Sequence, residues 1–144
     1  MVSMNNTIGF KITFGVNEGY FHANENTSDN LNKVSDDIIL MISQVANEPY
    51  GKGSWFGQKR DIYVSGILTP ANICYPSMFG CPQGGEKGFI YSGCMNPAFV
   101  ENKNCYMQAV ESLAKMIKKK YQQSTVTVEF TDTEMVYLQN GGVI

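Results

Sequence analysis

The stretch IGFKITFGV, residues 8–16, decides the fold class because its side chains alternate strictly between two kinds. Every second residue from Ile8 to Val16 is apolar, and Lys11 and Thr13 lie between them. A period of two residues is typical of a strand that buries one face. The stretch therefore predicts a half-buried strand near the start of the chain.

The period then changes from two residues to that of a helix over residues 28–51. Thr27 or Ser28 is the expected N-cap, and Pro49 with Gly51 is expected to end the helix. Apolar residues at helical spacing predict one buried face. These residues are Leu31, Val34, Ile38, Met41, Ile42 and Val45.

A second helix is predicted over residues 102–121, with Asn102 or Asn104 as its N-cap. Lys118, Lys119 and Lys120 fall in its last turn, where cations complement the helix dipole. Its apolar stripe consists of Tyr106, Val110, Leu113, Ile117 and Tyr121.

The remaining apolar stretches predict strands over residues 61–69, 87–95 and 126–130, with a short fifth strand over 135–138. TDTE, residues 131–134, is the expected turn between the last two. The order β-α-β-β-α-β is that of the ferredoxin-like α+β fold, in which both helices cover one face of an antiparallel sheet. With 144 residues and 43% hydrophobic residues, the sequence predicts a single domain over residues 1–144.

Such a fold leaves one face of the sheet uncovered. If Val64, Ile90 and Val126 face the helices, a mixture of tyrosines, hydroxyls and charges lies on the other face. This mixture favours a homodimer contact or a ligand cavity, and a solvated face is the alternative. The residues expected there are Lys11, Thr13, Tyr63, Ser65, Ile67, Tyr91, Thr127 and Glu129.

Charge and hydropathy exclude several function classes. The net charge is −2 and Arg60 is the only arginine, which argues against nucleic-acid binding because arginine is the usual phosphate and base reader. The sequence has no signal-peptide pattern and no apolar stretch that approaches the roughly 20 residues of a membrane span. We therefore expect a cytoplasmic protein that binds no membrane.

The four cysteines are Cys74, Cys81, Cys94 and Cys105. Structural zinc sites use close pairs such as C-x₂₋₄-C, and these spacings contain no such pair. In a reducing compartment we expect four thiols without a disulfide. The sequence predicts no metal and no cofactor.

A small enzyme remains an alternative. Cys105 falls in the first turn of the second predicted helix, where the helix dipole stabilises a thiolate, and Cys81 lies in a loop of prolines and glycines. A nucleophilic cysteine needs a base, and His22 is the only histidine. Glu86 is a further acid–base candidate, because it lies in the same loop region.

The stretch YGKGSWFGQKR, residues 50–60, contains the only tryptophan beside several cations. Trp55 with Lys52, Lys59 and Arg60 has the composition of a contact loop for an anionic ligand or partner. A core plug at Trp55 is the alternative.

The sequence contains no recognisable catalytic constellation, so we predict a non-enzymatic, homo-oligomeric binding module. Its ligand, a small molecule or a partner protein, is expected on the open sheet face or between subunits. The alternatives are a small cytosolic enzyme using His22, Glu86 or a cysteine, and a small inhibitor or adaptor that occludes a partner. The predicted ligand-binding residues are Trp55, Tyr63, Tyr91, Lys52, Arg60 and His22.

Overall fold

The computed structural model of the chain describes residues 2–17, 29–49 and 59–138. The elements follow the order β-α-β-β-α-β, with one short 3₁₀ turn, η1, after the second strand. This order confirms the predicted ferredoxin-like α+β fold. The elements are β1 (Val2–Gly15), α1 (Leu31–Asn47), β2 (Ile67–Ile73), η1 (Ser77–Phe79), β3 (Glu86–Cys94), α2 (Lys103–Lys120) and β4 (Thr127–Leu138).

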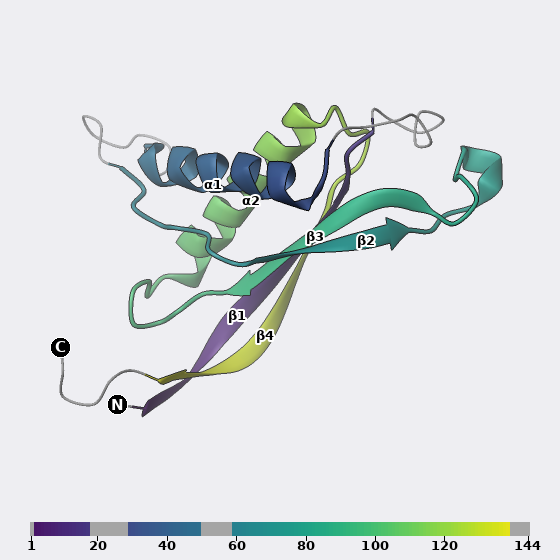
Figure 1. Cartoon of the computed structure of the whole chain (residues 1–144). Coiled ribbons are helices and arrows are strands. Elements are labelled where there is room, and N and C mark those ends of the chain that lie inside the picture. The colour runs from purple at the N-terminus through teal and green to yellow at the C-terminus, as the bar shows by residue number, and fades with distance from the viewer. Residues whose placement is uncertain (1, 18–28, 50–58, 139–144) are drawn as a thin grey trace.

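The four strands form one antiparallel sheet in the order β2-β3-β1-β4. Both helices lie on the same face of this sheet, and the other face is not covered by any described element (Figure 1). Strands β1 and β4 continue past the end of β3 as a two-stranded arm that projects from the body (Figure 1). None of the helices in the described part of the chain is long and apolar enough to cross a membrane.

The alternation in β1 has the predicted effect. Its apolar residues Ile8, Phe10, Ile12 and Phe14 are buried beneath the helices. Phe14 stacks on Tyr121 from the end of α2, with ring centroids 5.7 Å apart. One face of the central strand therefore forms the middle of the core.

The N-cap of helix α1 lies two or three residues after the positions expected from the sequence. Asn30 is the N-cap, and its side-chain oxygen accepts a hydrogen bond of 3.0 Å from the backbone N–H of Lys33. Asparagine caps as well as serine does, and the four residues 27–30 are all of cap-forming types, so they could not be ranked from the sequence. Thr27 and Ser28 lie outside the described residues.

Helix α2 has the predicted N-cap and a defined C-terminal motif. Asn102 accepts a hydrogen bond of 3.1 Å from the backbone N–H of Cys105. At the other end, Gln122 has a left-handed φ of 50°, and the Gln122 and Gln123 N–H groups bond to the carbonyls of Lys119 and Lys118. This pair of bonds is a Schellman motif, which ends the helix and turns the chain back toward the sheet.

Two strand predictions need correction. Strand β2 occupies residues 67–73 rather than 61–69, because Asp61 adopts a left-handed φ of 57° and a local turn joins Tyr63 to Ser65. The TDTE segment is not a turn and there is no fifth strand among the described residues. Residues 127–138 form one strand, because the long β1 offers partners along their whole length.

The prediction for β3 was wrong in phase by one residue. Tyr91 pairs with Ile12, is only 3% exposed, and donates a hydrogen bond of 2.6 Å to the carbonyl of Val64. Ile90 pairs with Thr13 and therefore lies on the open face. A shift of one residue exchanges the two faces of a strand, so Tyr91 belongs to the core.

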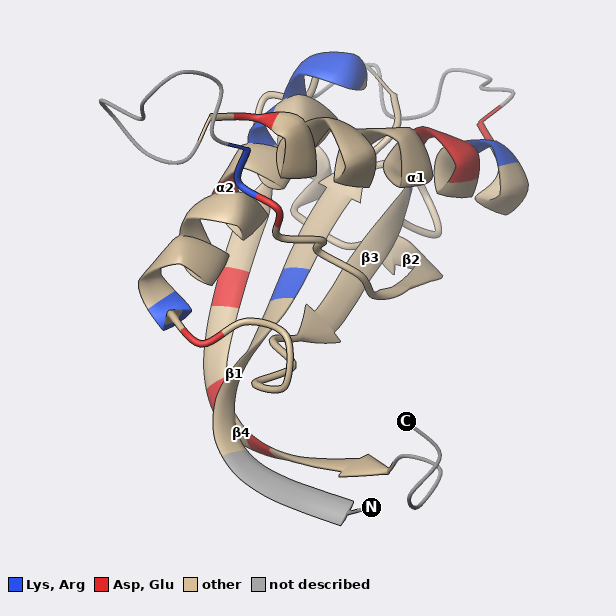
Figure 2. Cartoon of the chain, turned by 90° about the vertical axis from the view of Figure 1, so that its left-hand side faces the viewer, with Lys and Arg blue, Asp and Glu red and all other residues tan. Residues whose placement is uncertain are grey.

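Few positions on the four strands are charged (Figure 2). Lys11 and Glu129 face each other across neighbouring strands, with 3.9 Å between Nζ and Oε2. Ile67 on the edge strand is 71% exposed. The open face is therefore partly apolar and nearly neutral.

Candidate functional site

A cavity of about 450 Å³ lies at the end of the sheet where β1 ends and β3 begins. We call it the Glu86 cavity. Its walls come from the last residues of β1, the end of β2 and the η1 turn after it, the first residue of β3, and the segment between α2 and β4. Cavities of this volume hold small molecules.

Glu86 is the only carboxylate among the residues that line this cavity in the described part of the chain. It is 5% exposed, and Tyr75 donates a hydrogen bond of 2.8 Å to its Oε1. No described Lys or Arg forms an ion pair with it. A buried carboxylate is costly without a cation, so the cavity is suited to a positively charged group.

The absence of a side chain at Gly15 leaves room for the Glu86 carboxylate. An ideal Cβ on Gly15 would lie 1.9 Å from Glu86 Oε2 and 2.7 Å from the side-chain oxygen of Gln123. Both oxygens therefore lie against the bare backbone of Gly15. Any other residue at this position would push at least one of them away.

Gln123 presents an oxygen rather than a nitrogen to this point. Its amide nitrogen donates hydrogen bonds to two backbone carbonyls, that of Asn17 and, at 2.9 Å, that of Tyr121. These two bonds use both N–H groups and fix the orientation of the amide. The Schellman motif at the end of α2 holds Gln123 in place, so two acceptor oxygens converge beside Gly15.

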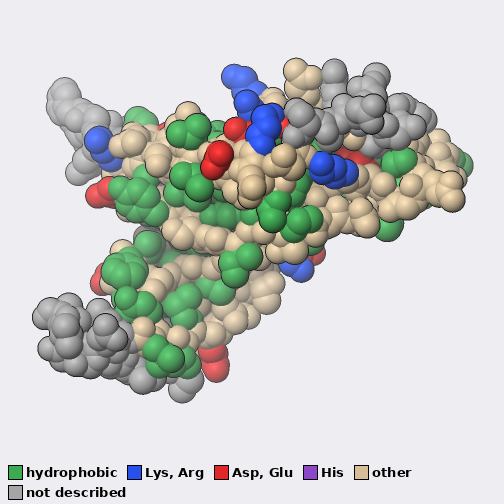
Figure 3. Space-filling view, in the orientation of Figure 1, with side chains coloured by type: hydrophobic (Ala, Val, Ile, Leu, Met, Phe, Trp, Pro, Cys, Tyr) green, Lys and Arg blue, Asp and Glu red, His purple; other side chains and the backbone are tan. Residues whose placement is uncertain are grey.

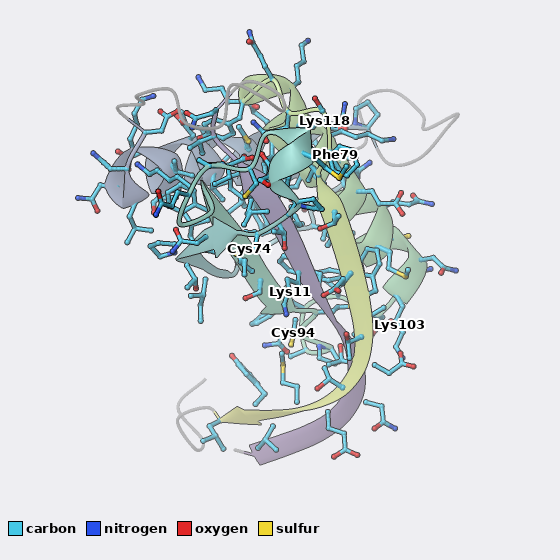
Figure 4. The ribbon with its side chains drawn as sticks, turned by 90° about the vertical axis from the view of Figure 1, so that its right-hand side faces the viewer. Lys11, Cys74, Phe79, Cys94, Lys103 and Lys118 are labelled. Carbon is cyan, nitrogen blue, oxygen red and sulfur yellow. The ribbon has the colours of Figure 1, made fainter. Side chains whose placement is uncertain are left out.

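The rest of the cavity wall is mainly apolar. Phe14 and Ile73 contribute from the strands, and Phe79 of the η1 turn is 54% exposed at its mouth. Figure 4 shows Phe79 at the upper end of the sheet, far from Cys94 at the lower part. An apolar wall with few polar groups is typical of a small-molecule site.

The predicted ligand-binding residues do not form this cavity. Tyr63 is 59% exposed, and its hydroxyl lies 3.5 Å from Asp61 Oδ1. The Arg60 side chain is mostly buried, with one nitrogen 4.0 Å from Glu48 Oε2. Tyr91 lies in the core. His22, Lys52 and Trp55 fall outside the described residues.

The four cysteines come from different segments of the chain: the residue after β2, the loop before β3, the end of β3 and the start of α2. The four of them, all in the described part of the chain, form no disulfide. Cys105 lies in the first turn of α2, as the sequence predicted, and is partly buried. No cluster of three metal-ligating side chains occurs in residues 2–17, 29–49 and 59–138.

Sequence reasoning identified Glu86 but missed Tyr75 and Gln123. Glu86 was a candidate because of its place in the loop region of prolines and glycines, and in the structure it is the first residue of β3. Nothing in the sequence pairs Tyr75 or Gln123 with it, because they are separated from Glu86 by 11 and 37 residues along the chain. The antiparallel pairing of β2 with β3 brings Tyr75 to Glu86, and the motif that ends α2 brings Gln123 there.

Comparison with known proteins gives a family. A sequence model described as SAM lyase matches residues 5–139, a span that includes every residue named above for the Glu86 cavity. The searches of curated proteins and of solved structures found no match. The match indicates an enzyme, in line with the enzymatic alternative, and gives no support to a non-enzymatic module. The chain belongs to the SAM lyase family.

Proposed function

We propose that the chain cleaves S-adenosylmethionine (SAM) and that the Glu86 cavity is its substrate site. The observation that carries this proposal is the buried Glu86 carboxylate, which has no described cationic partner. The substrate has two positive groups, a sulfonium and an α-ammonium, and one of them would supply the missing charge. The family match supports the same conclusion.

The α-ammonium is better suited than the sulfonium to the two acceptor oxygens of Glu86 and Gln123. An ammonium group has three N–H donors and needs acceptors, whereas a sulfonium has no donor. Glu86 Oε2 and Gln123 Oε1 are two such acceptors, and both lie against the backbone of Gly15. Hydrogen bonds from a charged donor to a carboxylate are short and strong. The proposed contact therefore fixes the amino-acid end of the substrate.

The sulfonium would then lie nearer the mouth, along the apolar wall that Phe14 and Phe79 form. A lyase breaks a bond without water, and a sulfonium sulfur leaves as a neutral thioether when a C–S bond breaks. The substrate's own carboxylate can displace the sulfur from its γ-carbon: a C–O bond forms, the C–S bond breaks, and sulfur keeps the electron pair. This route needs positioning and no external base, which suits a site where Glu86 is already occupied by the ammonium.

We also propose that the enzyme is a homo-oligomer. The Glu86 cavity opens near the uncovered sheet face, which exposes Ile67 and carries the half-buried Ile90. A second copy against this face would bury apolar surface and exclude water from the cavity. Sedimentation velocity at micromolar concentration tests this part, and a monomer would contradict it.

The test of the function compares Glu86→Gln with the wild type. Purified protein is mixed with SAM, and products are separated by chromatography and identified by mass. We expect the wild type to form a thioether nucleoside and a lactone, and Glu86→Gln to lose about 100-fold or more in kcat/KM, as expected for the loss of one partner of a buried charge pair.

Glu111→Gln is the matched control, because Glu111 is an exposed glutamate on α2 that lines no part of the cavity. Its kcat/KM should stay within about twofold of the wild type, as is usual for surface changes. A wild type that leaves SAM intact would reject the function. Full activity in Glu86→Gln would reject the site alone.

A further inference from the structure

A second cavity, of about 280 Å³, lies at the opposite end of β3. We call it the Tyr106 pocket. Asp61 and Tyr63 form one side, Cys94 and Phe99 another, and Tyr106 of α2 reaches it from the core. The nine residues of β3 separate it from the Glu86 cavity by about 26 Å at strand spacing. Figure 4 shows Cys94 well removed from Phe79.

The hydroxyl of Tyr106 is the unusual feature of this pocket. Tyr106 is 2% exposed, and its hydroxyl oxygen is buried without a hydrogen-bond partner among the described residues. Its neighbour Tyr91 shows the ordinary arrangement, with a hydrogen bond of 2.6 Å to the Val64 carbonyl. A buried hydroxyl without a partner is costly, and a bound ligand would remove that cost.

The Tyr106 hydroxyl is a donor at any physiological pH. Burial raises the pKa of Tyr106 above its ordinary value, and the nearby Cys94 and Tyr91 raise it further. The hydroxyl can therefore donate a hydrogen bond to a ligand, and a ring nitrogen is a suitable acceptor.

The rim of the pocket carries a hydrogen-bond acceptor, in contrast to the donor at Tyr106. Asp61 is an exposed carboxylate, and its left-handed backbone is held by a hydrogen bond of 2.9 Å from its N–H to the Ala46 carbonyl. No described Lys or Arg lines the pocket. A carboxylate without a cation calls for an N–H donor on the ligand.

Aromatic surface completes the pocket. Phe99 is 75% exposed and Tyr63 is 59% exposed. Phe99 is braced at one edge by Tyr137 of the β1–β4 arm, with ring centroids 5.9 Å apart. Figure 3 shows hydrophobic side chains on both sides of the hollow between the body and the projecting arm. Exposed aromatic rings beside a concave surface are suited to a flat ligand.

We propose that the Tyr106 pocket binds an aminopurine base. Its exocyclic amino group would donate to Asp61, a ring nitrogen would accept from the Tyr106 hydroxyl, and the ring would lie against Phe99. Adenine has this arrangement of an amino donor next to a ring acceptor. The pocket volume is near the lower limit for small-molecule sites, about 300 Å³, which suits a single base better than a larger ligand.

The experiment is a titration of the full chain with free adenine, followed by two-dimensional NMR of backbone amides. We expect the shifts of residues around Cys94 and Phe99 to change on binding. Tyr106→Phe should raise the Kd for adenine about tenfold, the effect of one lost hydrogen bond. Asp61→Asn should raise this Kd at least as much. Purine, which lacks the amino group, should bind about tenfold more weakly than adenine.

Two readouts separate this proposal from its alternatives. Tyr106→Phe should melt no lower than the wild type, because it removes an unsatisfied hydroxyl; a lower melting temperature would mean that the hydroxyl has a structural partner instead. Glu86→Gln should leave adenine binding unchanged. Two results would show that the pocket does not bind the base. In the first, Glu86→Gln lowers the affinity for adenine while Tyr106→Phe does not; in the second, adenine changes no amide chemical shift near Cys94. These outcomes are independent of SAM cleavage.

Discussion

Gly15→Ala is the sharpest test of the Glu86 cavity, because a single methyl group would occupy the point where two oxygens converge. The new Cβ would lie 1.9 Å from Glu86 Oε2, and real Cβ contacts essentially never fall below 3.0 Å. The carboxylate would therefore move by more than about 1 Å. A displacement of that size in a site of this kind costs about 100-fold in rate.

The structural cost of Gly15→Ala should be moderate. Overpacking of this kind costs about 1–3 kcal/mol in unfolding free energy, and the hydrogen bond from Tyr75 to Glu86 would be strained as well. We expect a folded protein with a lower melting temperature and kcat/KM for SAM reduced about 100-fold. Circular dichroism melts and product chromatography measure the two effects on the same sample.

Gly9→Ala is the control, since Gly9 lies on the same strand and the same face. An added Cβ there would make only ordinary contacts, 3.4 Å from the Gly93 carbonyl oxygen and 3.5 Å from Cys94 Sγ. Its activity and stability should match the wild type within about 1 kcal/mol. A Gly15→Ala enzyme with near-normal kcat/KM would refute the reasoning. The double variant Gly15→Ala, Glu86→Ala should melt higher than Gly15→Ala alone, because it removes the closer of the two clashes; a lower melting temperature would also contradict the reasoning.

Two further predictions concern stability. Gln122→Gly should raise the unfolding free energy by about 0.5–1 kcal/mol in urea titrations, because glycine adopts the left-handed backbone of Gln122 without strain; a loss of stability would contradict the Schellman assignment. Raising the pH should destabilise the fold: burial raises the pKa of Tyr91 to about 12, above the roughly 10 of an unfolded tyrosine, so the folded state holds this proton more tightly. Its contribution is complete below pH 10 and is lost as the pH rises through about 12, so the melting temperature should fall in that window, and less steeply in Tyr91→Phe.

Local patterns in the sequence were enough to predict the order of the elements. Each of these patterns lies within a single element. The alternation in residues 8–16 predicted a strand, and the apolar stripe and the Asn102 cap predicted the second helix; the structure has both elements. The failures occurred where the pattern was ambiguous by one residue. Tyr91 and its neighbour Ile90 are both apolar enough to face the core, and only pairing with Ile12 and Thr13 decides between them.

The cavity could be predicted only in part. Glu86 was a candidate because it lies in a loop region of prolines and glycines. Its partners were not, because a tyrosine in a loop and a glutamine after a helix are common and carry no periodic signal. The absence of a side chain at Gly15 is the feature that makes room for Glu86, but a glycine in a strand can equally mark a bulge or a bend.

Gly15 and the two residues whose oxygens lie against it come from distant parts of the chain: β1, the start of β3 and the segment after α2. A molecule that contacts all three can stay bound only while the central strand pairing and the docking of α2 are both intact. Its binding energy therefore adds to the free energy of global unfolding rather than to that of one loop. Substrate analogues should slow amide hydrogen exchange throughout the sheet, including strands far from the cavity, and the degree of slowing gives the occupancy of the site without any turnover.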